Sequence, residues 1–380
     1  MPADDFRFEL VAQDQQTGAR AGLLHTPHGI IETPIFMPVG THATVKTLSQ
    51  DNLESLQAQI ILGNAYHLYL RPGHDLVDRA GGLHGFMNWP HPILTDSGGY
   101  QVFSLSQLNK IREEGVEFQS HIDGTRHLFT PEKVMEIEHG LGADIIMAFD
   151  ECTPYPATHQ EAQQSMELTL RWMDRCLERH RQLAQERSHR PPQALFGIVQ
   201  GGIYADLRAR CANSLAALDL PGYALGGLGV GEPRDEMMET VEATMPYVPA
   251  GKPRYLMGVG LPHDMVEAVG LGVDMFDCVI PTRNARNGTA FTAAGRVRLR
   301  NASLAEDFNP IEEGCACPAC RRHSRAYIRH LFQNREILGL HLATSHNIHF
   351  YLQLMRTMRQ AIIEGNFADW QAAFLAGYGD

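Results

Sequence analysis

The sequence predicts a parallel (β/α)8 barrel, a TIM barrel, with an inserted hairpin and a C-terminal zinc-binding subdomain. Three observations lead to this fold class. Eight short apolar runs recur along the 380 residues, longer stretches of helical character separate them, and three cysteines gather in the segment CACPAC. Because the apolar runs are continuous rather than alternating, we expect strands covered on both faces. Eight strands that alternate with helices favour a closed barrel over an open doubly wound sheet.

The eight expected strands are the runs at 34–40, 60–66, 92–99, 144–151, 194–202, 223–231, 254–260 and 275–281. Several stretches between them carry helix-end signals, such as the cap Thr130 followed by Pro131 and a later glycine. Residues 115–130 alternate with period two around an Asp-Gly turn, which predicts a hairpin inserted between the third and fourth strands. No GxGxxG motif follows the first strand, so a dinucleotide-binding fold is disfavoured.

We expect three parts in the chain. Residues 1–300 form the barrel with its N-terminal segment, residues 301–350 form a zinc-binding insertion, and residues 351–380 form C-terminal helices that complete the barrel layer. The segment FTAAGRVRLRN, after the eighth strand, has strand character of its own.

Composition indicates a folded cytoplasmic protein. The N-terminus lacks the basic and apolar regions of a signal peptide, and no apolar run approaches the roughly 20 residues that span a bilayer. Seven cysteines without a secretion signal favour reduced thiols or metal ligands over disulfides.

The charge is unevenly distributed. The formal net charge of −12 argues against indiscriminate binding of polyanions. Between Pro281 and Arg335, however, ten arginines face four acids, a local balance of +6 that leaves −18 for the rest of the chain. Such a pattern suits a protein that holds a nucleic acid at one face only, although a solvated basic surface is an equally simple interpretation.

Polar residues and glycines stand where the expected strands end. They are Asn64, Asp96, Asp150, Gln200, Gly227, Gly231, Gly260 and Asp277. In such a barrel the carboxyl ends of the strands carry the catalytic groups. Each aspartate alone could cap a helix or form an ion pair, but three at equivalent positions favour a site. Two carboxylates suit retaining glycosyl transfer, and a third acid with a glutamine suits recognition of a purine edge.

The final strand contains the most unusual of these acids. Asp277 lies within the apolar run MFDCVIP, and a segment that we expect to be a loop follows it with Arg283 and Arg286. An unpaired buried carboxylate is costly. The arginines therefore either neutralise the acid or hold an anionic substrate beside it.

Cys315, Cys317 and Cys320 form a C-x-C-x2-C motif, and histidines follow at 323, 330, 341, 346 and 349. Three thiolates and one imidazole make a closed tetrahedral zinc site, which is structural because no position remains for water. Spacing alone does not choose the histidine.

Several motifs together resemble those of the queuine tRNA-ribosyltransferases of the bacterial type, also called tRNA-guanine transglycosylases. They are ILTDSGGYQVFSL, MAFDECTPYPAT, GGLGVGEP, YLMGVG, MFDCVIPTRNARNG and CACPAC with SHN, and they cover nearly the whole chain. The resemblance implies a zinc-bearing (β/α)8 barrel and a homodimer in which the zinc region of one subunit helps to pack the other. It also implies exchange of the wobble guanine in the anticodon loop of certain tRNAs for 7-aminomethyl-7-deazaguanine.

The resemblance also implies roles for residues at matching positions. Asp277 resembles the nucleophile that attacks the ribose, and Asp96 resembles the general acid and base. Asp274 is a rival to Asp277, but it precedes the strand and should lie at the opposite rim. The remaining roles are base reading by Asp150, Gln200, Gly227 and Leu228; stacking by Tyr100 and Met257; selection of a small aminomethyl group by Cys152 and Val230; tRNA binding by Arg283 and Arg286; and zinc binding by Cys315, Cys317, Cys320 and His346.

One residue departs from the family pattern, because Gly229 stands where alanine or serine is expected. Two other functions remain open. A hydrolytic glycosidase would use the same acids, but it would need an aromatic-lined groove, and only three Trp are present. A non-catalytic RNA-binding partner would not need Asp96, Asp150 and Asp277 together.

Overall fold

The structure, a computed structural model, describes residues 6–105 and 109–379. Its centre is a closed barrel of eight parallel strands. These are β4 (Ile35–Gly40), β5 (Ile61–Asn64), β6 (Ile93–Asp96), β10 (Ile145–Met147), β11 (Ala194–Val199), β12 (Tyr223–Leu225), β13 (Arg254–Leu256) and β14 (Met275–Cys278). All eight expected strands are present, which confirms the (β/α)8 barrel. All but β4 end earlier than their apolar runs, because those runs continue into loops and helices.

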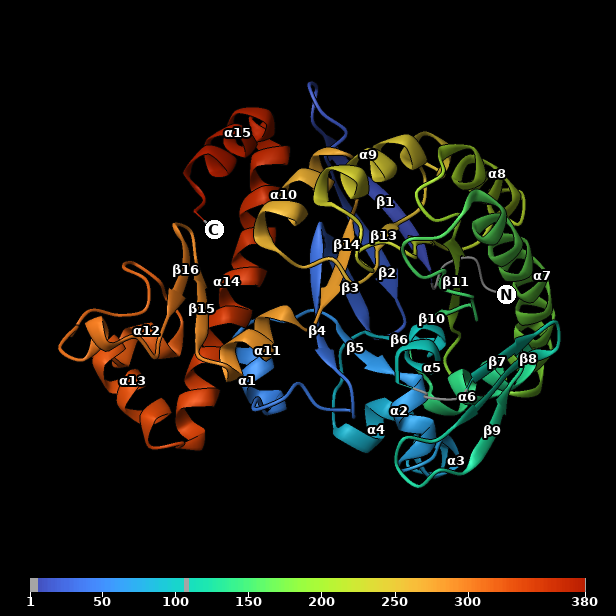
Figure 1. Ribbon diagram of the computed structural model, residues 1–380, viewed down its shortest axis with the longest axis horizontal. Coiled ribbons are helices and arrows are strands. Elements are labelled where there is room, and N and C mark those ends of the chain that lie inside the picture. The colour runs from blue at the N-terminus through green and yellow to red at the C-terminus, as the bar shows by residue number, and fades with distance from the viewer. Residues whose placement is uncertain (1–5, 106–108, 380) are drawn as a thin grey trace.

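Helices surround the barrel (Figure 1). Those before β14 are α1 (Gln50–Ser55), α2 (Ala65–Leu70), α3 (His74–Arg79), α4 (Gly82–Met87), α5 (Gly99–Leu105), α6 (Pro131–Leu141), α7 (His159–Glu186), α8 (Ala205–Ala216), α9 (Arg234–Thr244) and α10 (Pro262–Gly270). Helix α6 begins as expected: Thr130 accepts a hydrogen bond from the Lys133 amide, Pro131 is its first residue, and Gly142 ends it in the left-handed conformation. Two apolar cores result, one inside the barrel and one between barrel and helices.

Two three-stranded antiparallel sheets lie outside the barrel. The expected hairpin is present as β8 (Gly115–Gln119) and β9 (Arg126–Phe129), and β7 (Asn109–Arg112) adds a third antiparallel strand. The sequence did not predict the N-terminal meander β1 (Arg7–Gln13), β2 (Arg20–Thr26) and β3 (Gly29–Thr33). Leu24 and Ile31 of this meander join the core inside the barrel, so it closes the amino ends of the barrel strands.

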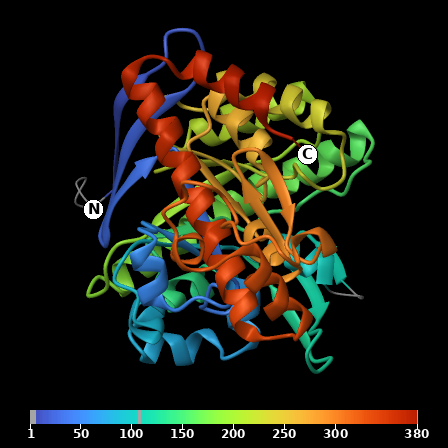
Figure 2. The same cartoon turned by 90° about the vertical axis from the view of Figure 1, so that its left-hand side faces the viewer.

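The last part of the chain forms a separate region on one side of the barrel (Figure 1). It contains β15 (Thr289–Thr292), β16 (Gly295–Arg298), α12 (Pro318–Arg322) and α13 (Arg325–Gln333), with their own apolar cluster. The long helix α14 (Ile337–Glu364) then packs on β4, and α15 (Phe367–Gly377) follows it. Figure 2 shows α14 between the N-terminal strands and the hairpin β15–β16.

The segment expected to be a loop after β14 is instead the short helix α11 (Ile280–Arg286). Pro281 sits at the start of this helix, where proline fits because its missing N–H is not needed. Helix α11 packs against α14, more than 50 residues away in sequence. Tertiary packing therefore stabilises a helix that its local composition does not favour.

Asp144, immediately before β10, holds the amino end of the barrel together. Its carboxylate accepts a hydrogen bond from the Ile93 amide at 2.9 Å and pairs with His28 at 2.7 Å and His84 at 3.2 Å. The two imidazole rings are stacked, with centroids 3.6 Å apart and planes 17° apart. Lone pairs that lie in two nearly parallel ring planes do not converge on one point. This cluster is therefore an ion-pair network rather than a metal site.

We predict that this network makes stability sensitive to acid. Burial alone would raise the pKa of Asp144, but the hydrogen bond with His28 and the close approach of His84 outweigh it and lower the pKa from 3.8 to about 2. A lowered folded-state pKa stabilises the fold above the unfolded value, and this contribution is lost as pH falls from about 4 to about 2. Asp144→Asn should remove up to about 2 kcal/mol of that acid-dependent stability.

Urea denaturation between pH 6 and about pH 2 measures this effect. The wild type should lose more stability with falling pH than Asp144→Asn does. The matched control is Asp219→Asn, which removes an exposed partner of Lys252 and should leave the pH dependence unchanged. Parallel pH profiles for wild type and Asp144→Asn would contradict the prediction.

Candidate active site and metal centre

The structure brings the expected strand-end residues to one end of the barrel. Asp96 is the last residue of β6, and Asp150 and Gln200 follow β10 and β11. Asp277 is the third of the four residues of β14. Because all these strands are parallel, their carboxyl ends form a single mouth.

Two donors hold the carboxylate of Asp277 through one of its oxygens. The Tyr255 hydroxyl donates to Oδ1 at 2.6 Å, and the Gly258 amide donates to the same atom at 2.8 Å. Among the described residues, Oδ2 accepts no hydrogen bond. Burial raises the pKa of Asp277, and the two hydrogen bonds act against that rise. The arrangement fixes the side chain and leaves one oxygen available to react.

Asp274 lies at the other end of the same strand. It directly precedes β14, is fully buried, and forms an ion pair with Arg20 at 2.5 Å. Its position and partner fit a structural role at the amino end of the barrel. The ion pairs of the described chain do not join Asp277 to Arg283 or Arg286, so neutralisation of this acid by the arginines is excluded.

Asp96 has a different environment from Asp277. Its carboxylate accepts hydrogen bonds from Asn64 Nδ2 at 2.5 Å, the Ala65 amide at 3.1 Å and Gln101 Nε2 at 3.2 Å. Burial, followed by the nearby charge of Asp277, raises the pKa of Asp96 to about 8. The raised pKa favours the protonated form of Asp96, which can donate a proton.

Asp150 and Gln200 form a second polar pair in the mouth. Gln200 Nε2 donates to Asp150 Oδ2 at 2.7 Å. Burial raises the pKa of Asp150 to about 6, against the lowering effect of hydrogen bonds from Gln200 and Ser97. Gln200 Oε1 is buried and has no partner among the described residues. Buried polar atoms are normally satisfied, so a free one at a mouth is typical of a ligand site.

The loop after β12 is held by its own acid. The Glu232 carboxylate accepts hydrogen bonds from the amides of Gly229 at 2.5 Å, Val230 at 3.0 Å and Gly231 at 3.1 Å. Gly227 and Gly229 have φ of +66° and +69°, in the region that favours glycine. Leu228 between them is buried.

The other expected residues occupy varied surroundings. Tyr100, on α5, is 53% exposed, whereas Met257 packs against the core inside the barrel. Cys152 is partly buried, and burial raises the pKa of its thiol to about 12. Arg283 and Arg286 lie on α11, and the buried Nη1 of Arg286 has no hydrogen-bond partner among the described residues.

Cys315, Cys317, Cys320 and His346 converge as a group that could hold a metal ion. His346 Nδ1 lies 3.8, 3.5 and 3.3 Å from the three sulfurs in that order. Zinc bonds of about 2.3 Å to sulfur and about 2.0 Å to nitrogen imply a separation of about 3.6 Å in a tetrahedron. His346 Nε2 donates to the Phe291 carbonyl at 2.8 Å, which leaves Nδ1 free as a ligand. The residues therefore fit zinc.

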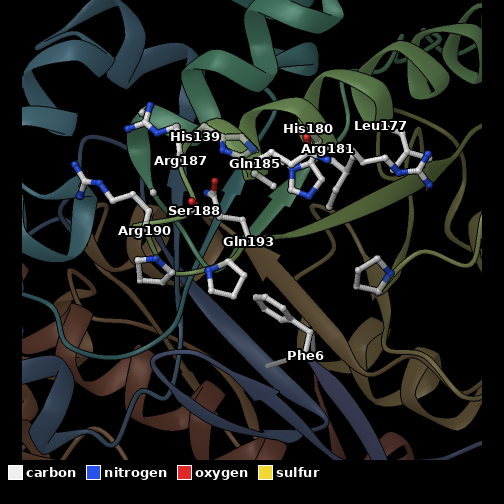
Figure 3. A pocket seen from close by; sticks show the side chains of 18 of the residues that line it. Phe6, His139, Leu177, His180, Arg181, Gln185, Arg187, Ser188, Arg190 and Gln193 are labelled. Carbon is white, nitrogen blue, oxygen red and sulfur yellow. Dashed lines mark hydrogen bonds between the residues drawn. The ribbon is translucent and has the colours of Figure 1, made fainter. Parts of the chain in front are cut away.

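A cavity of about 920 Å³ (Figure 3) has none of the mouth residues in its lining. Its lining includes residues just before β11, β12 and β13, so it opens at the amino ends of the strands. His139 and His180 face each other in it, with Nε2 and Nδ1 3.0 Å apart. Arg187 and Arg190 also line it, but both are paired with Asp78. None of the expected site residues contributes to this cavity.

Sequence reasoning missed the immediate partners of the two acids, Tyr255 and Gln101. The only signal for Tyr255 was a hydroxyl-bearing residue inside the apolar run RYLMGVG. Its partner lies on the neighbouring strand, and strand pairing cannot be read from one run alone.

The sequence resemblance implies that Asp277 is a nucleophile, and on that basis we predict that Tyr255→Phe slows catalysis without weakening substrate binding. A hydrogen bond to a charged group is worth roughly 1.5–3 kcal/mol, so kcat should fall about 10- to 100-fold with little change in KM. Because that bond lowers the pKa of Asp277, the acidic limb of the pH–rate profile should move to higher pH. Steady-state kinetics across pH measures both effects, and an unshifted profile with wild-type kcat would contradict them.

Comparisons with known proteins agree with this geometry. The family model described as Queuine tRNA-ribosyltransferase matches residues 14–380. The queuine tRNA-ribosyltransferase of Thermoanaerobacter sp. (strain X514) is 56% identical over 373 residues, 98% of each chain. That of Symbiobacterium thermophilum is 57% identical over 369 residues, 97% of this chain and 90% of its own.

In the described part of the chain, no helix is both long and apolar enough to cross a membrane.

The barrel and the carboxylates at its mouth agree with these relatives. The chain belongs to the queuine tRNA-ribosyltransferase family and is a transferase of the pentosyl class.

Proposed function

We propose that this enzyme replaces the wobble guanine of queuosine-type tRNAs with 7-aminomethyl-7-deazaguanine through a covalent Asp277–ribose intermediate. One observation carries the proposal: two partly buried carboxylates share the mouth in different surroundings. Asp277 is oriented by two donors and has a free oxygen, whereas the pKa of Asp96 is raised to about 8, which favours its protonated form.

The first half of the reaction breaks the bond between guanine N9 and ribose C1′. Asp277 Oδ2 attacks C1′ as the electron pair of the N9–C1′ bond moves to the guanine. Asp96 donates its proton to the leaving base, which departs neutral. The product is an ester between Asp277 and C1′ of the tRNA.

The second half reverses these steps with a different base. Asp96, now ionised, accepts the N9 proton of 7-aminomethyl-7-deazaguanine, and N9 attacks C1′. The bond between Asp277 and C1′ breaks, so both carboxyls return to their starting states. One glycosidic bond replaces another, and no energy cofactor is required.

The base site that we propose lies beside these acids. Asp150, Gln200 and the backbone at Gly227 and Leu228 read the edge of the base, and the free Gln200 Oε1 supports this role. Tyr100 and Met257 stack on its two faces. Cys152 and Val230 limit the space for its substituent, which favours an aminomethyl group.

In this proposal the tRNA binds at the basic helix α11. Arg283 and Arg286 contact the anticodon loop on either side of the exchanged nucleotide, and the unpartnered Nη1 of Arg286 supports this role. Bound zinc would cross-link the region between β15 and α14 as a structural ion, with no part in the chemistry.

We also infer a cytoplasmic homodimer in which the zinc region of one subunit packs on the other. Large apolar side chains of that region, Phe308 at 80% and Ile337 at 75%, are exposed in the single chain. Their burial between subunits would remove that apolar area from water.

Incubation of the enzyme with radiolabelled guanine and a tRNA that has guanine at the wobble position tests the function. Label should enter the tRNA, and unlabelled 7-aminomethyl-7-deazaguanine should then displace it. The competing glycosidase function predicts release of guanine with no base in its place. Absence of label from the tRNA would overturn the proposal.

We predict that Gly229→Ala narrows the range of bases that the enzyme binds. Gly229 has φ of +69°, and its amide donates to Glu232. Glycine lowers the cost of reorienting the neighbouring peptide, so alanine should make the base-binding states harder to interchange. A Cβ would meet only Val259 at 3.7 Å, so steric exclusion is not the cause. The ratio of the affinities for guanine and 7-aminomethyl-7-deazaguanine should differ from that of the wild type. Unchanged affinities for both bases would refute this prediction.

A further inference from the structure

Arg208, on α8, is a fully buried cation behind the mouth of the barrel. Its exposed fraction is 0%, and burial lowers its pKa to about 10, so it remains charged at neutral pH. Among residues 6–105 and 109–379 it has no ion-pair partner. Burying an unpaired charge is costly. The structure must therefore compensate Arg208 in another way.

Three backbone carbonyls provide the compensation. Arg208 Nε donates to the Gly202 carbonyl at 2.7 Å, Nη1 to Val199 at 3.0 Å, and Nη2 to Gly226 at 2.9 Å. Val199 is the last residue of β11, and Gly226 directly follows β12. The rigid fork of the guanidinium therefore joins the ends of two neighbouring strands of the barrel.

This contact sets the direction of one peptide group. In a planar trans peptide, the carbonyl and the following N–H point in opposite directions. Because the Gly226 carbonyl faces Arg208, the N–H of Gly227 faces away from it. That N–H donates no hydrogen bond within the described residues. The amides of Gly229, Val230 and Gly231, by contrast, donate to the Glu232 carboxylate. It is available to a ligand.

Gly227 also lies against the proposed base-reading side chain. A Cβ at Gly227 would come within 2.4 Å of Gln200 Oε1, and Gln200 directly follows Val199. Arg208 thus holds the backbone next to both Gln200 and Gly227. A shift of either carbonyl would displace a group that faces the base.

We propose that Arg208 is a positioning residue for base recognition, because it fixes the Gly226–Gly227 peptide so that the Gly227 N–H donates to the carbonyl oxygen O6 of a guanine-type base. The inference rests on the proposed function. The recognised chemistry is a hydrogen-bond acceptor on the six-membered ring of the purine.

The test compares guanine with 6-thioguanine, which keeps the N1–H and the amino group but replaces O6 with sulfur, a weaker acceptor. Inhibition constants of both bases are measured against labelled guanine. The wild type should prefer guanine. In Arg208→Lys, which keeps the charge and loses the fork, this preference should fall about three- to tenfold, as for the loss of one neutral hydrogen bond. Arg208→Met, which also loses the charge, should lower the preference for guanine by a similar factor.

The matched control is Arg210→Lys, on the same helix, where the side chain is exposed and pairs with Glu167 at 2.9 Å. It should keep the wild-type preference. Melting curves verify that each variant is folded. If Arg208→Met does not fold, the test uses Arg208→Lys alone.

The outcomes separate this inference from the function it rests on. A folded Arg208→Lys that binds both bases more weakly with the wild-type ratio would overturn the positioning role, because a purely structural defect affects both bases alike. A wild type that exchanges guanine without preferring it to 6-thioguanine would also overturn it. Failure of the wild type to exchange guanine at all would instead overturn the proposed function.

Discussion

The Asp277→Asn variant will lose base exchange by at least about 10⁴-fold, because the proposed function makes Asp277 the nucleophile of a covalent mechanism. Asparagine has nearly the same shape and can still accept hydrogen bonds from Tyr255 and Gly258 through its amide oxygen. The fold and the tRNA affinity should therefore remain close to those of the wild type. Incorporation of labelled guanine into tRNA measures the loss.

A matched variant separates chemistry from stability. Asp274→Asn changes an acid three residues earlier in the chain that pairs with Arg20 away from the mouth. It should lower the melting temperature yet retain exchange at temperatures where it is folded. Exchange lost in Asp274→Asn and kept in Asp277→Asn would reverse the two assignments.

The Cys317→Ser variant will lose most of its zinc and destabilise the region between β15 and α14. Cys317 is fully buried, and its sulfur lies 3.5 Å from His346 Nδ1. Because the binding energy of a structural zinc ion is folding energy, loss of one ligand should cost about 3 kcal/mol or more. Elemental analysis measures the metal, and limited proteolysis measures the local unfolding.

Cys176→Ser provides the control for that variant. Cys176 is also fully buried, but it lies on α7 and outside the metal group. It should keep one zinc ion per chain. A full complement of metal in Cys317→Ser would reassign the ligands.

The barrel could be predicted from sequence because its strands are buried on both faces. Such strands appear as continuous apolar runs, and all eight were found in this way. The meander β1–β3 was missed because β1 is mostly exposed, with Leu10 and Val11 at its surface, so its pattern resembles neither a buried nor a half-buried strand. Helix α11 was taken for a loop because its stability comes from α14, which is distant in sequence.

Part of the candidate site could also be predicted from the sequence. Acids at the ends of parallel strands must meet, so Asp96, Asp150 and Asp277 could be grouped from position alone. Two of their partners could not: Tyr255 reaches Asp277 from the neighbouring strand, and Gln101 reaches Asp96 from helix α5. Arg208 gave no signal, since its partners are backbone carbonyls, which every residue has.

The most direct test of the account is to locate the covalent bond. Wild-type enzyme is mixed with tRNA, denatured, and digested with nuclease and protease, and mass spectrometry identifies the peptide that retains a ribose fragment. The account predicts the fragment on Asp277, in the peptide that contains MFDCVIPTR. A fragment on Asp96 or Asp274, or exchange without any adduct, would contradict it.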